Sequence, residues 1–227
     1  MTAAVHAATA AGIRVFGPVG DRRRALEELL PGEGAWEVEL GFGKGRFLLA
    51  RAAVLGERRF LGLEMAGEYF RLAARRLARR GLGNAALLQA EALYALSALL
   101  PRGFAADLHV YFPDPWPKAR HQRRRLFSPA SVDLLLGALT TGGRLHFATD
   151  FLEYGAEVEA ILRAHPALRV ERLEGPWPDG ARTNYEAKYV AEGRPILRLS
   201  ARLVDDPVPH PDGLERIRSA HARDADD

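Results

Sequence analysis

The stretch VELGFGKG, residues 38–45, joins the end of an apolar run to three glycines that alternate with other residues. Residues 35–43 have the pattern of a strand that enters a turn, and residues 46–56 have the pattern of a helix. Glycines in such a turn let a ligand lie against the backbone, because no β-carbon obstructs it. The stretch therefore predicts one strand–turn–helix unit of an α/β fold with a ligand at the turn.

The spacing of this loop differs from that of a dinucleotide-binding loop. The pattern is acid-x-Gly-x-Gly-x-Gly, formed by Glu39, Gly41, Gly43 and Gly45, and Arg46 stands where the third fingerprint glycine would be. Glu39 would repel a pyrophosphate and suits a cationic amino-acid group. A nicotinamide oxidoreductase is therefore disfavoured, and a plain tight turn is the alternative interpretation of the glycines.

Two further acids follow the next two predicted strands. Glu64 lies 23 residues after Gly41, where an acid can bind both ribose hydroxyls. Glu91 can accept a hydrogen bond from an adenine amino group. A solvated strand end and a helix N-terminal acid are their respective structural alternatives. With Glu39, they predict an adenosine ligand that has an amino-acid arm and no phosphate, which is S-adenosylmethionine.

Strands and helices alternate along most of the chain. Strands are predicted at residues 35–43, 58–65, 84–92, 107–112, 142–150, 168–174 and 194–204, and helices at 46–56, 68–83, 92–100, 128–139 and 151–165. This order predicts a mostly parallel, seven-stranded sheet with helices on both faces. The last two strands have no clear helix between them and are expected to pair antiparallel at one edge. Ligands bind at the carboxyl ends of such strands, where the unusual residues cluster.

Length and composition place limits on the protein. The chain has 227 residues and no cysteine, which excludes disulfides and cysteine chemistry and fits a cytoplasmic location. No apolar run approaches the ~20 residues that span a membrane. We expect a flexible N-terminal arm at 1–34 rather than a signal peptide, a catalytic domain at 35–204 and a frayed polar tail at 205–227. No metal site is predicted, and the oligomeric state, monomer or homodimer, is left open.

A rigid, basic segment, YFPDPWPKARHQRRR, occupies residues 111–125. Prolines on both sides of Asp114 restrict its backbone, so its carboxylate should point in a fixed direction. Trp116 offers a face on which a base can stack. Lys118 and the arginines that follow can bind phosphates, although the net charge of the chain is only +3. A rigid structural turn with a solvated basic end is the alternative.

These residues carry a family resemblance. The chain resembles the bacterial tRNA (guanine-N7-)-methyltransferases over residues 35 to about 200, on the segments VELGFGKG, FLGLEM, YFPDPWPKARHQRRR, FATD and TNYEAKYVAEGRPI. The PDPWPK segment is much more specific than the glycine loop. The resemblance implies a Rossmann-like class I methyltransferase fold, S-adenosylmethionine as cofactor and methylation of guanine N7 in the tRNA variable loop.

The resemblance also implies roles for individual residues. Glu39, Glu64 and Glu91 would line the cofactor site, although the family usually has Asp or Asn where this chain has Glu91. Asp114 would lie at the catalytic centre, in contact with cofactor or guanine. The implied substrate-binding residues are Lys118, Asp150, Thr183, Asn184, Tyr185 and Glu186.

Several of these residues have competing structural interpretations. Thr183 and Glu186 have the spacing of a helix capping box, and Asp150 with Glu153 resembles one. His109 and His146 lie in apolar strands and are expected to be packed or hydrogen-bonded rather than catalytic. Trp177 is expected either to stack on RNA or to cover the core. An exocyclic-amine methyltransferase and a non-catalytic RNA-binding protein of the same fold are the alternative functions.

Overall fold

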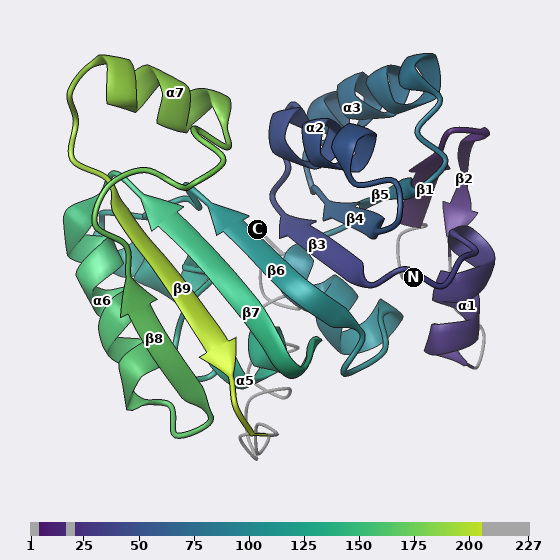
Figure 1. Cartoon of the computed structure of the whole chain (residues 1–227). Coiled ribbons are helices and arrows are strands. Elements are labelled where there is room, and N and C mark those ends of the chain that lie inside the picture. The colour runs from purple at the N-terminus through teal and green to yellow at the C-terminus, as the bar shows by residue number, and fades with distance from the viewer. Residues whose placement is uncertain (1–4, 17–20, 206–227) are drawn as a thin grey trace.

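The computed structural model describes residues 5–16 and 21–205, and one continuous sheet runs through them (Figure 1). Its strand order is β2-β1-β5-β4-β3-β6-β7-β9-β8. The strands are β1 Val5–Thr9, β2 Gly12–Phe16, β3 Trp36–Leu40, β4 Arg59–Leu63, β5 Ala85–Gln89, β6 Ala105–Tyr111, β7 Leu139–Thr149, β8 Leu168–Arg172 and β9 Leu197–Leu203. The seven strands predicted from the sequence are all present.

The sheet has nine strands rather than seven because the N-terminal segment adds a hairpin. β1 pairs antiparallel with β5 and with β2, so the expectation of a flexible arm was wrong for residues 5–16. Residues 1–4 and 17–20 lie outside the described residues. Leu87 and Leu88 of β5 are fully buried. The hairpin covers a strand that would otherwise be a sheet edge, and such edges are usually protected.

Five parallel strands form the centre of the sheet, and the chain reverses direction across it. β3, β4 and β5 progress to one side, and β6 then lies on the other side of β3. β9 pairs antiparallel with β7 and β8, which confirms the predicted antiparallel edge. The carboxyl ends of β3 and β6 therefore flank a topological switch point, where α/β sheets bind ligands.

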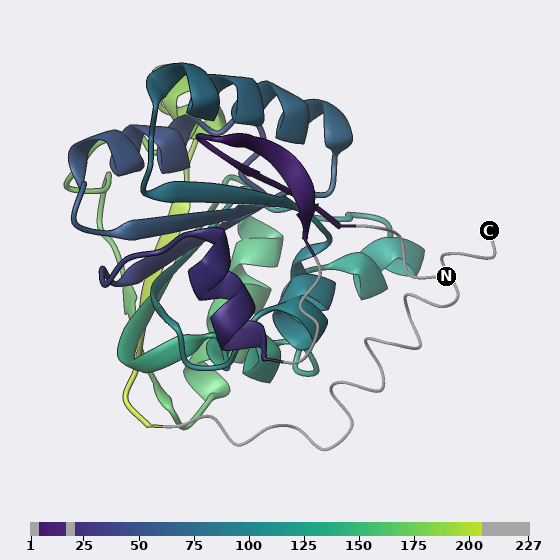
Figure 2. The same ribbon diagram turned by 90° about the vertical axis from the view of Figure 1, so that its right-hand side faces the viewer.

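Helices cover both faces of the sheet, as predicted (Figure 2). They are α1 Arg22–Leu29, α2 Arg46–Val54, α3 Gly67–Arg80, α4 Ala92–Tyr94, α5 Val132–Leu136, α6 Leu152–Ala164 and α7 Asn184–Ala191, with a π-helix at Ala95–Leu99 and a 3₁₀-helix at Ala119–Arg124. Apolar side chains of α2 and α3 pack on one face, and those of α1, α5, α6 and the π-helix pack on the other. Among the described residues, no helix is long and apolar enough to cross a membrane.

α7 was not predicted, because its eight residues show little apolar periodicity and only Glu186 is fully buried. The predicted tail from residue 206 onward lies outside the described residues. The single helix predicted at 92–100 divides into α4 and the π-helix. Gly81 ends α3 in the left-handed conformation, two residues before the end of the helix predicted at 68–83.

Candidate active site

The glycine loop leaves β3 at the switch point and leads directly into α2. Gly41, Gly43 and Gly45 all have positive φ angles of 73°, 51° and 70°, which glycine adopts without strain. A β-carbon at Gly41 or Gly43 would meet no atom within 4 Å, whereas one at Gly45 would lie 3.1 Å from the Ala73 side chain. The loop is therefore open in front of its first two glycines and packed against α3 at the third.

A glycine in the neighbouring strand makes this loop possible, and sequence reasoning missed it. A β-carbon at Gly62 of β4 would lie 2.5 Å from the Phe42 ring and 2.9 Å from Leu87. Phe42 is almost fully buried, so its ring is the apolar anchor of the glycine loop. The signal was available, since Gly62 interrupts an otherwise apolar strand, and glycine in a strand often marks a close approach.

Glu39 lies beneath the loop and is 3% exposed. Its Oε2 accepts a hydrogen bond from Leu48 N at 3.2 Å. Burial raises the pKa of Glu39 to about 8, with a smaller contribution in the same direction from Glu64, and the bond from Leu48 opposes the rise. A carboxyl group in this position ionises readily only when a cation approaches it.

Glu64 and Glu91 both bind backbone amides at the carboxyl ends of their strands. Glu64 accepts hydrogen bonds from Gly43 N and Ala66 N, both at 2.9 Å, so it ties the glycine loop to the end of β4. Glu91 is the N-cap of α4 and accepts from Leu93 N at 3.0 Å and Tyr94 N at 2.6 Å. The structure thus gives Glu91 the helix-capping role that was its structural alternative.

Asp114 follows β6 on the other side of the switch point. It is exposed, and no side-chain hydrogen bond to it is found in the described part of the chain. The residues two positions away on each side, Phe112 and Trp116, have positive φ angles of 52° and 42°. Such angles are unfavourable for aromatic residues and persist where neighbouring groups hold them. Phe112 packs against Tyr185 and Tyr189 of α7, with ring centroids 6.4 and 5.6 Å apart.

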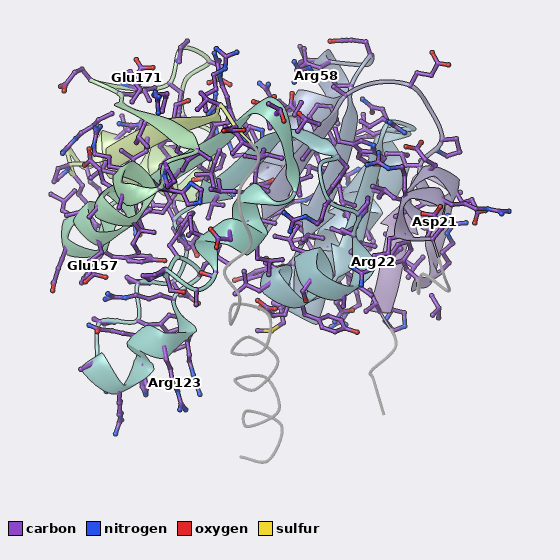
Figure 3. All side chains as sticks on the ribbon, turned by 90° about the horizontal axis from the view of Figure 1, so that it is seen from below. Asp21, Arg22, Arg58, Arg123, Glu157 and Glu171 are labelled. Carbon is purple, nitrogen blue, oxygen red and sulfur yellow. The ribbon has the colours of Figure 1, made fainter. Side chains whose placement is uncertain are left out.

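The basic segment divides into an exposed part and a buried anchor. Lys118, Arg120, Arg123 and Arg124 are exposed, and Figure 3 shows Arg123 on the part that projects from the body. Arg124 also lies over the Trp116 ring, with Cζ 5.3 Å from its centroid. We refer to these four residues as the basic strip.

Arg125 does not belong to the basic strip, contrary to the sequence-based expectation. Its side chain is 5% exposed. It donates to Pro115 O at 2.8 Å, pairs with Glu157 of α6 and lies 4.8 Å over the Tyr154 ring. Arg125 therefore fastens the Pro-Asp-Pro turn to α6, a role that charge clustering in the sequence could not reveal.

The expected substrate residues beyond β7 lie near α7. Asp150 pairs with Arg194, whose Cζ lies 4.0 Å over the Tyr189 ring. Asp150 does not cap α6, since Phe151 is the N-cap and Thr149 Oγ1 accepts the bond from Phe151 N. Tyr185 is 58% exposed and packs against Tyr189, with ring centroids 6.1 Å apart.

Thr183 and Glu186 form the start of α7, as their capping-box spacing predicts. Thr183 Oγ1 accepts from Glu186 N at 3.0 Å, while Glu186 Oε2 accepts from Arg182 N at 2.8 Å. Glu186 is 0% exposed, and its Oε1 accepts from Arg198 Nε at 2.7 Å. Its carboxylate is directed into the protein, so the structure separates Glu186 from the exposed Tyr185.

A buried polar network lies under these elements. Glu37 accepts from Arg51 Nε at 2.5 Å and from Arg58 Nη1 at 2.7 Å. His109 contacts Glu37 Oε2 at 3.1 Å and Tyr111 Oη at 2.8 Å, and its ring stacks 5.0 Å from that of His146. His146 Nε2 contacts Asp107 Oδ1 at 2.9 Å, so both histidines are packed and hydrogen-bonded, as expected. Trp177 is 3% exposed and covers the core next to Phe47 and Tyr111, which was one of its two predicted roles.

Protonation of the network sets the direction of its hydrogen bonds. Burial raises the pKa of Glu37 on its own, but hydrogen bonds from His109 and Arg51 outweigh it and lower the pKa to about 2. Burial lowers the pKa of His109 to about 4, although its bond to Glu37 opposes this. At neutral pH, Glu37 is therefore a carboxylate that only accepts, so the neutral His109 ring donates through Nε2–H and accepts from Tyr111 at Nδ1.

We expect this network to make the fold sensitive to acid. The unfolded chain protonates His109 near pH 6.5 and the folded chain near pH 4. The unfolded state thus binds more protons between these values, and stability falls as the pH falls, by up to about 1.4 kcal/mol per pH unit from this group. Glu37 lowers stability in the same direction at more acidic pH, between pH 4.5 and 2. Urea unfolding of the wild type and of His109→Gln between pH 4 and 6.5 should show a shallower slope in the variant; equal slopes would contradict the assignment.

No group of three or more His, Cys, Asp or Glu side chains within residues 5–16 and 21–205 is arranged to hold a metal ion. The carboxyl groups around the switch point bind backbone amides in the cases of Glu39, Glu64 and Glu91.

Comparison with solved structures identifies the fold. The 16S rRNA methyltransferase KamB superposes with a TM-score of 0.61 at 15% identity, over 87% of this chain and 99% of that one. A 16S rRNA (adenine(1408)-N(1))-methyltransferase from Catenulisporales acidiphilia, solved with its cosubstrate SAM, has a TM-score of 0.57 at 16% identity, over 91% and 100%. At these identities the likeness shows the class I methyltransferase fold alone.

Sequence comparison is more specific. A family model described as "Putative methyltransferase" matches residues 34–199. The tRNA (guanine-N(7)-)-methyltransferase of Nitrosococcus oceani is 36% identical over 71% of this chain and 69% of that protein. The same-named proteins of Alkalilimnicola ehrlichii and Thiobacillus denitrificans are 35% and 37% identical, over 75% and 73% of this chain and 73% and 74% of theirs. The chain therefore belongs to the tRNA (guanine-N(7)-)-methyltransferase family.

Proposed function

We propose that this protein transfers a methyl group from S-adenosylmethionine to N7 of a guanine in the variable loop of tRNA. One observation carries the proposal: the acid-and-glycine loop after β3 and the Pro-Asp114-Pro turn after β6 flank the same switch point of the sheet. A ligand held by the first loop would have its reactive end beside the second. Membership of the family supports the identity of the base, and a tRNA substrate supports a cytoplasmic location.

The residues present fit S-adenosylmethionine. The open space in front of Gly41 and Gly43 allows a ligand to lie against the backbone. Glu39, with its pKa of about 8, gains a favourable partner when an ammonium group approaches its buried carboxyl. We assign the amino-acid end of the cofactor to Glu39, the ribose hydroxyls to Glu64 and the adenine edge to Glu91. When bound, the cofactor supplies a methyl group on a sulfonium, which is already activated for transfer.

The protein contributes orientation and charge stabilisation in this mechanism. Guanine N7 has a lone pair and no hydrogen, so no general base is needed to remove a proton from it. Catalysis then depends on alignment for in-line attack and on exclusion of water. We assign Asp114 to two tasks: its carboxylate accepts hydrogen bonds from the guanine edge and offsets the positive charge that develops on the ring.

The basic strip and α7 complete the proposed RNA site. Lys118, Arg120 and Arg123 are exposed and can bind phosphates on either side of the target base. Arg124 lies over the Trp116 ring and His121 packs against it, and we assign the Trp116 ring to stacking with a base. Asn184 and Tyr185 at the start of α7 would contact the nucleotide from the opposite side. We assign Thr183, Glu186 and Asp150 to holding this surface in place, because their side chains bind protein groups.

The reaction can be tested directly. Purified protein is incubated with labelled S-adenosylmethionine and unmodified tRNA, and the product is treated with borohydride and aniline. These reagents open the cationic ring of N7-methylguanine and break the strand there. A single break in the variable loop is expected. Label without a break would indicate methylation of an exocyclic amine and contradict the proposal. Cofactor binding without incorporation would indicate a non-catalytic RNA-binding protein.

A further inference from the structure

Arg182, just before α7, contacts residues of several elements besides its own loop. Its side chain is 10% exposed, and its Cζ lies 4.1 Å over the Trp177 ring and 5.5 Å from the centroid of Phe47. Its Nε donates to both carboxylate oxygens of Asp179, at 3.0 and 3.2 Å. The guanidinium is thus enclosed by the 174–183 loop and by the first turn of α2.

The same guanidinium reaches the end of β6. Arg182 Nη1 donates to Tyr111 Oη at 2.5 Å, and Tyr111 in turn donates to His109 Nδ1 at 2.8 Å. Since Glu37 accepts from His109, each bond in this chain has one direction, and the Tyr111 hydroxyl is held between a donor and an acceptor. Tyr111 lies three residues before Asp114, so this series of hydrogen bonds holds the end of β6, from which the Pro-Asp-Pro turn begins.

The backbone of Arg182 binds α7, while its side chain binds β6. Arg182 N donates to Glu186 Oε2 at 2.8 Å, and the next residue, Thr183, is the N-cap of α7. Two further bonds join this segment to α2: Arg46 Nη1 donates to Asn184 Oδ1 at 3.0 Å, and Arg51 Nη1 to Asp179 Oδ2 at 3.4 Å. A single residue therefore connects three elements that flank the switch point.

We propose that Arg182 is a positioning residue for methyl transfer, which sets the start of α7 against the end of β6 and so sets Asn184 and Tyr185 relative to Asp114. The inference rests on the proposed function, because the proposed function is what assigns Asn184, Tyr185 and Asp114 to the RNA site. Arg182 does not itself contact substrate. It acts through Tyr111 on one side and through the α7 N-cap on the other.

Only arginine can make this set of contacts. Its planar group stacks on an aromatic ring while its several N–H groups donate in different directions, whereas a lysine ammonium is a point charge. Arg182→Lys should keep the charge but lose the stacking and the set of N–H groups that donate in different directions. Arg182→Met should keep much of the apolar contact and lose every hydrogen bond of the side chain. Tyr111→Phe removes only the hydroxyl group that the guanidinium binds.

The expected kinetic result is a loss of tRNA turnover with the cofactor site unchanged. Misplacement of reacting groups by about 1 Å can cost about 100-fold in rate. For Arg182→Met we expect kcat to fall by about 10- to 100-fold, with a smaller fall for Arg182→Lys, while the Kd for S-adenosylmethionine changes by less than about twofold. The double variant with Tyr111→Phe should be little worse than Arg182→Met alone, because both changes break the same contact.

A matched control and a readout without catalysis make the test decisive. Arg163→Met removes an arginine on α6 that pairs with Glu159 away from the switch point, and it should leave kcat unchanged. Hydrogen–deuterium exchange should be faster in residues 184–191 of Arg182→Met than in the wild type. If the wild type fails to methylate tRNA, the proposed function fails, yet the exchange result still tests whether Arg182 holds the start of α7. Unchanged exchange, or a fall in kcat that only follows the folded fraction, would overturn the inference.

Discussion

Replacement of Asp114 by alanine is expected to lower the turnover of tRNA by about 100-fold or more, which is the usual effect of removing one group that stabilises developing charge. Asp114 is exposed at the switch point, and its carboxylate has no hydrogen-bond partner in the described residues, so it is available to substrate. The prolines on each side hold it in place. The Kd for S-adenosylmethionine should change little, because Glu39 and Glu64 lie at the ends of β3 and β4, away from the Pro-Asp-Pro turn.

Two variants separate this role from general effects of charge and folding. Asp114→Asn keeps the shape and one acceptor oxygen, so its turnover should lie between those of the wild type and Asp114→Ala. Glu171→Ala removes an exposed acid from β8 and should leave turnover unchanged. Single-turnover measurements with the enzyme in excess over tRNA and with saturating cofactor would report the chemical step. Near-normal turnover in Asp114→Ala would mean that its carboxylate has no part in methyl transfer.

The second large effect is expected when arginines of the basic strip are removed. The double variant Arg120→Ala/Arg123→Ala removes two arginines assigned to phosphates and should weaken tRNA binding most at low salt. Each lost phosphate contact lowers the slope of log K against log[salt] by about 0.7 to 0.9, so the slope should fall by about 1 to 2. The control is Arg79→Ala/Arg80→Ala, an exposed pair of arginines in the last turn of α3. The same slope in all three proteins would show that the strip is only a solvated surface.

Arg125 has to be left in place in this experiment, because its loss should act through folding instead. It binds Pro115 O and Glu157 and packs on Tyr154, and removal of a buried charged donor leaves its partners unsatisfied. Arg125→Ala should lower the melting temperature and release the Pro-Asp-Pro turn, so kcat should fall as well as tRNA affinity. A variant with normal melting and a reduced salt slope would place Arg125 with the basic strip after all.

Much of the fold and part of the site could be predicted because the signals are local. The strand–turn–helix unit around Gly41, the left-handed stop at Gly81 and the antiparallel last strand all follow from residues close in sequence. The two loops were expected at one edge of the sheet because a parallel sheet with right-handed crossovers brings the carboxyl ends of its strands together. Glu39 and Asp114 then lie on either side of the switch point.

The N-terminal hairpin and α7 were missed because neither is stable by its own pattern. Val5 and Ala7 of β1 are buried only because β5 offers an unpaired edge, and small residues carry little strand preference. In α7, Glu186 faces inward and the apolar Val190 is 51% exposed, the reverse of an amphipathic helix. Arg198, which pairs with Glu186, is twelve residues further along the chain.

The sequence by itself determined the class of fold, the glycine loop with its acids, the rigid setting of Asp114 and the family. Each of these depends on residue type and spacing over a few positions. The tertiary structure alone decided which charged residues face solvent and which are enclosed. Arg123 projects from the body while Arg125, two residues later, is buried, and Arg182 joins α2, β6 and α7. Burial and hydrogen-bond partners come from segments far apart in the chain, so local pattern cannot specify them.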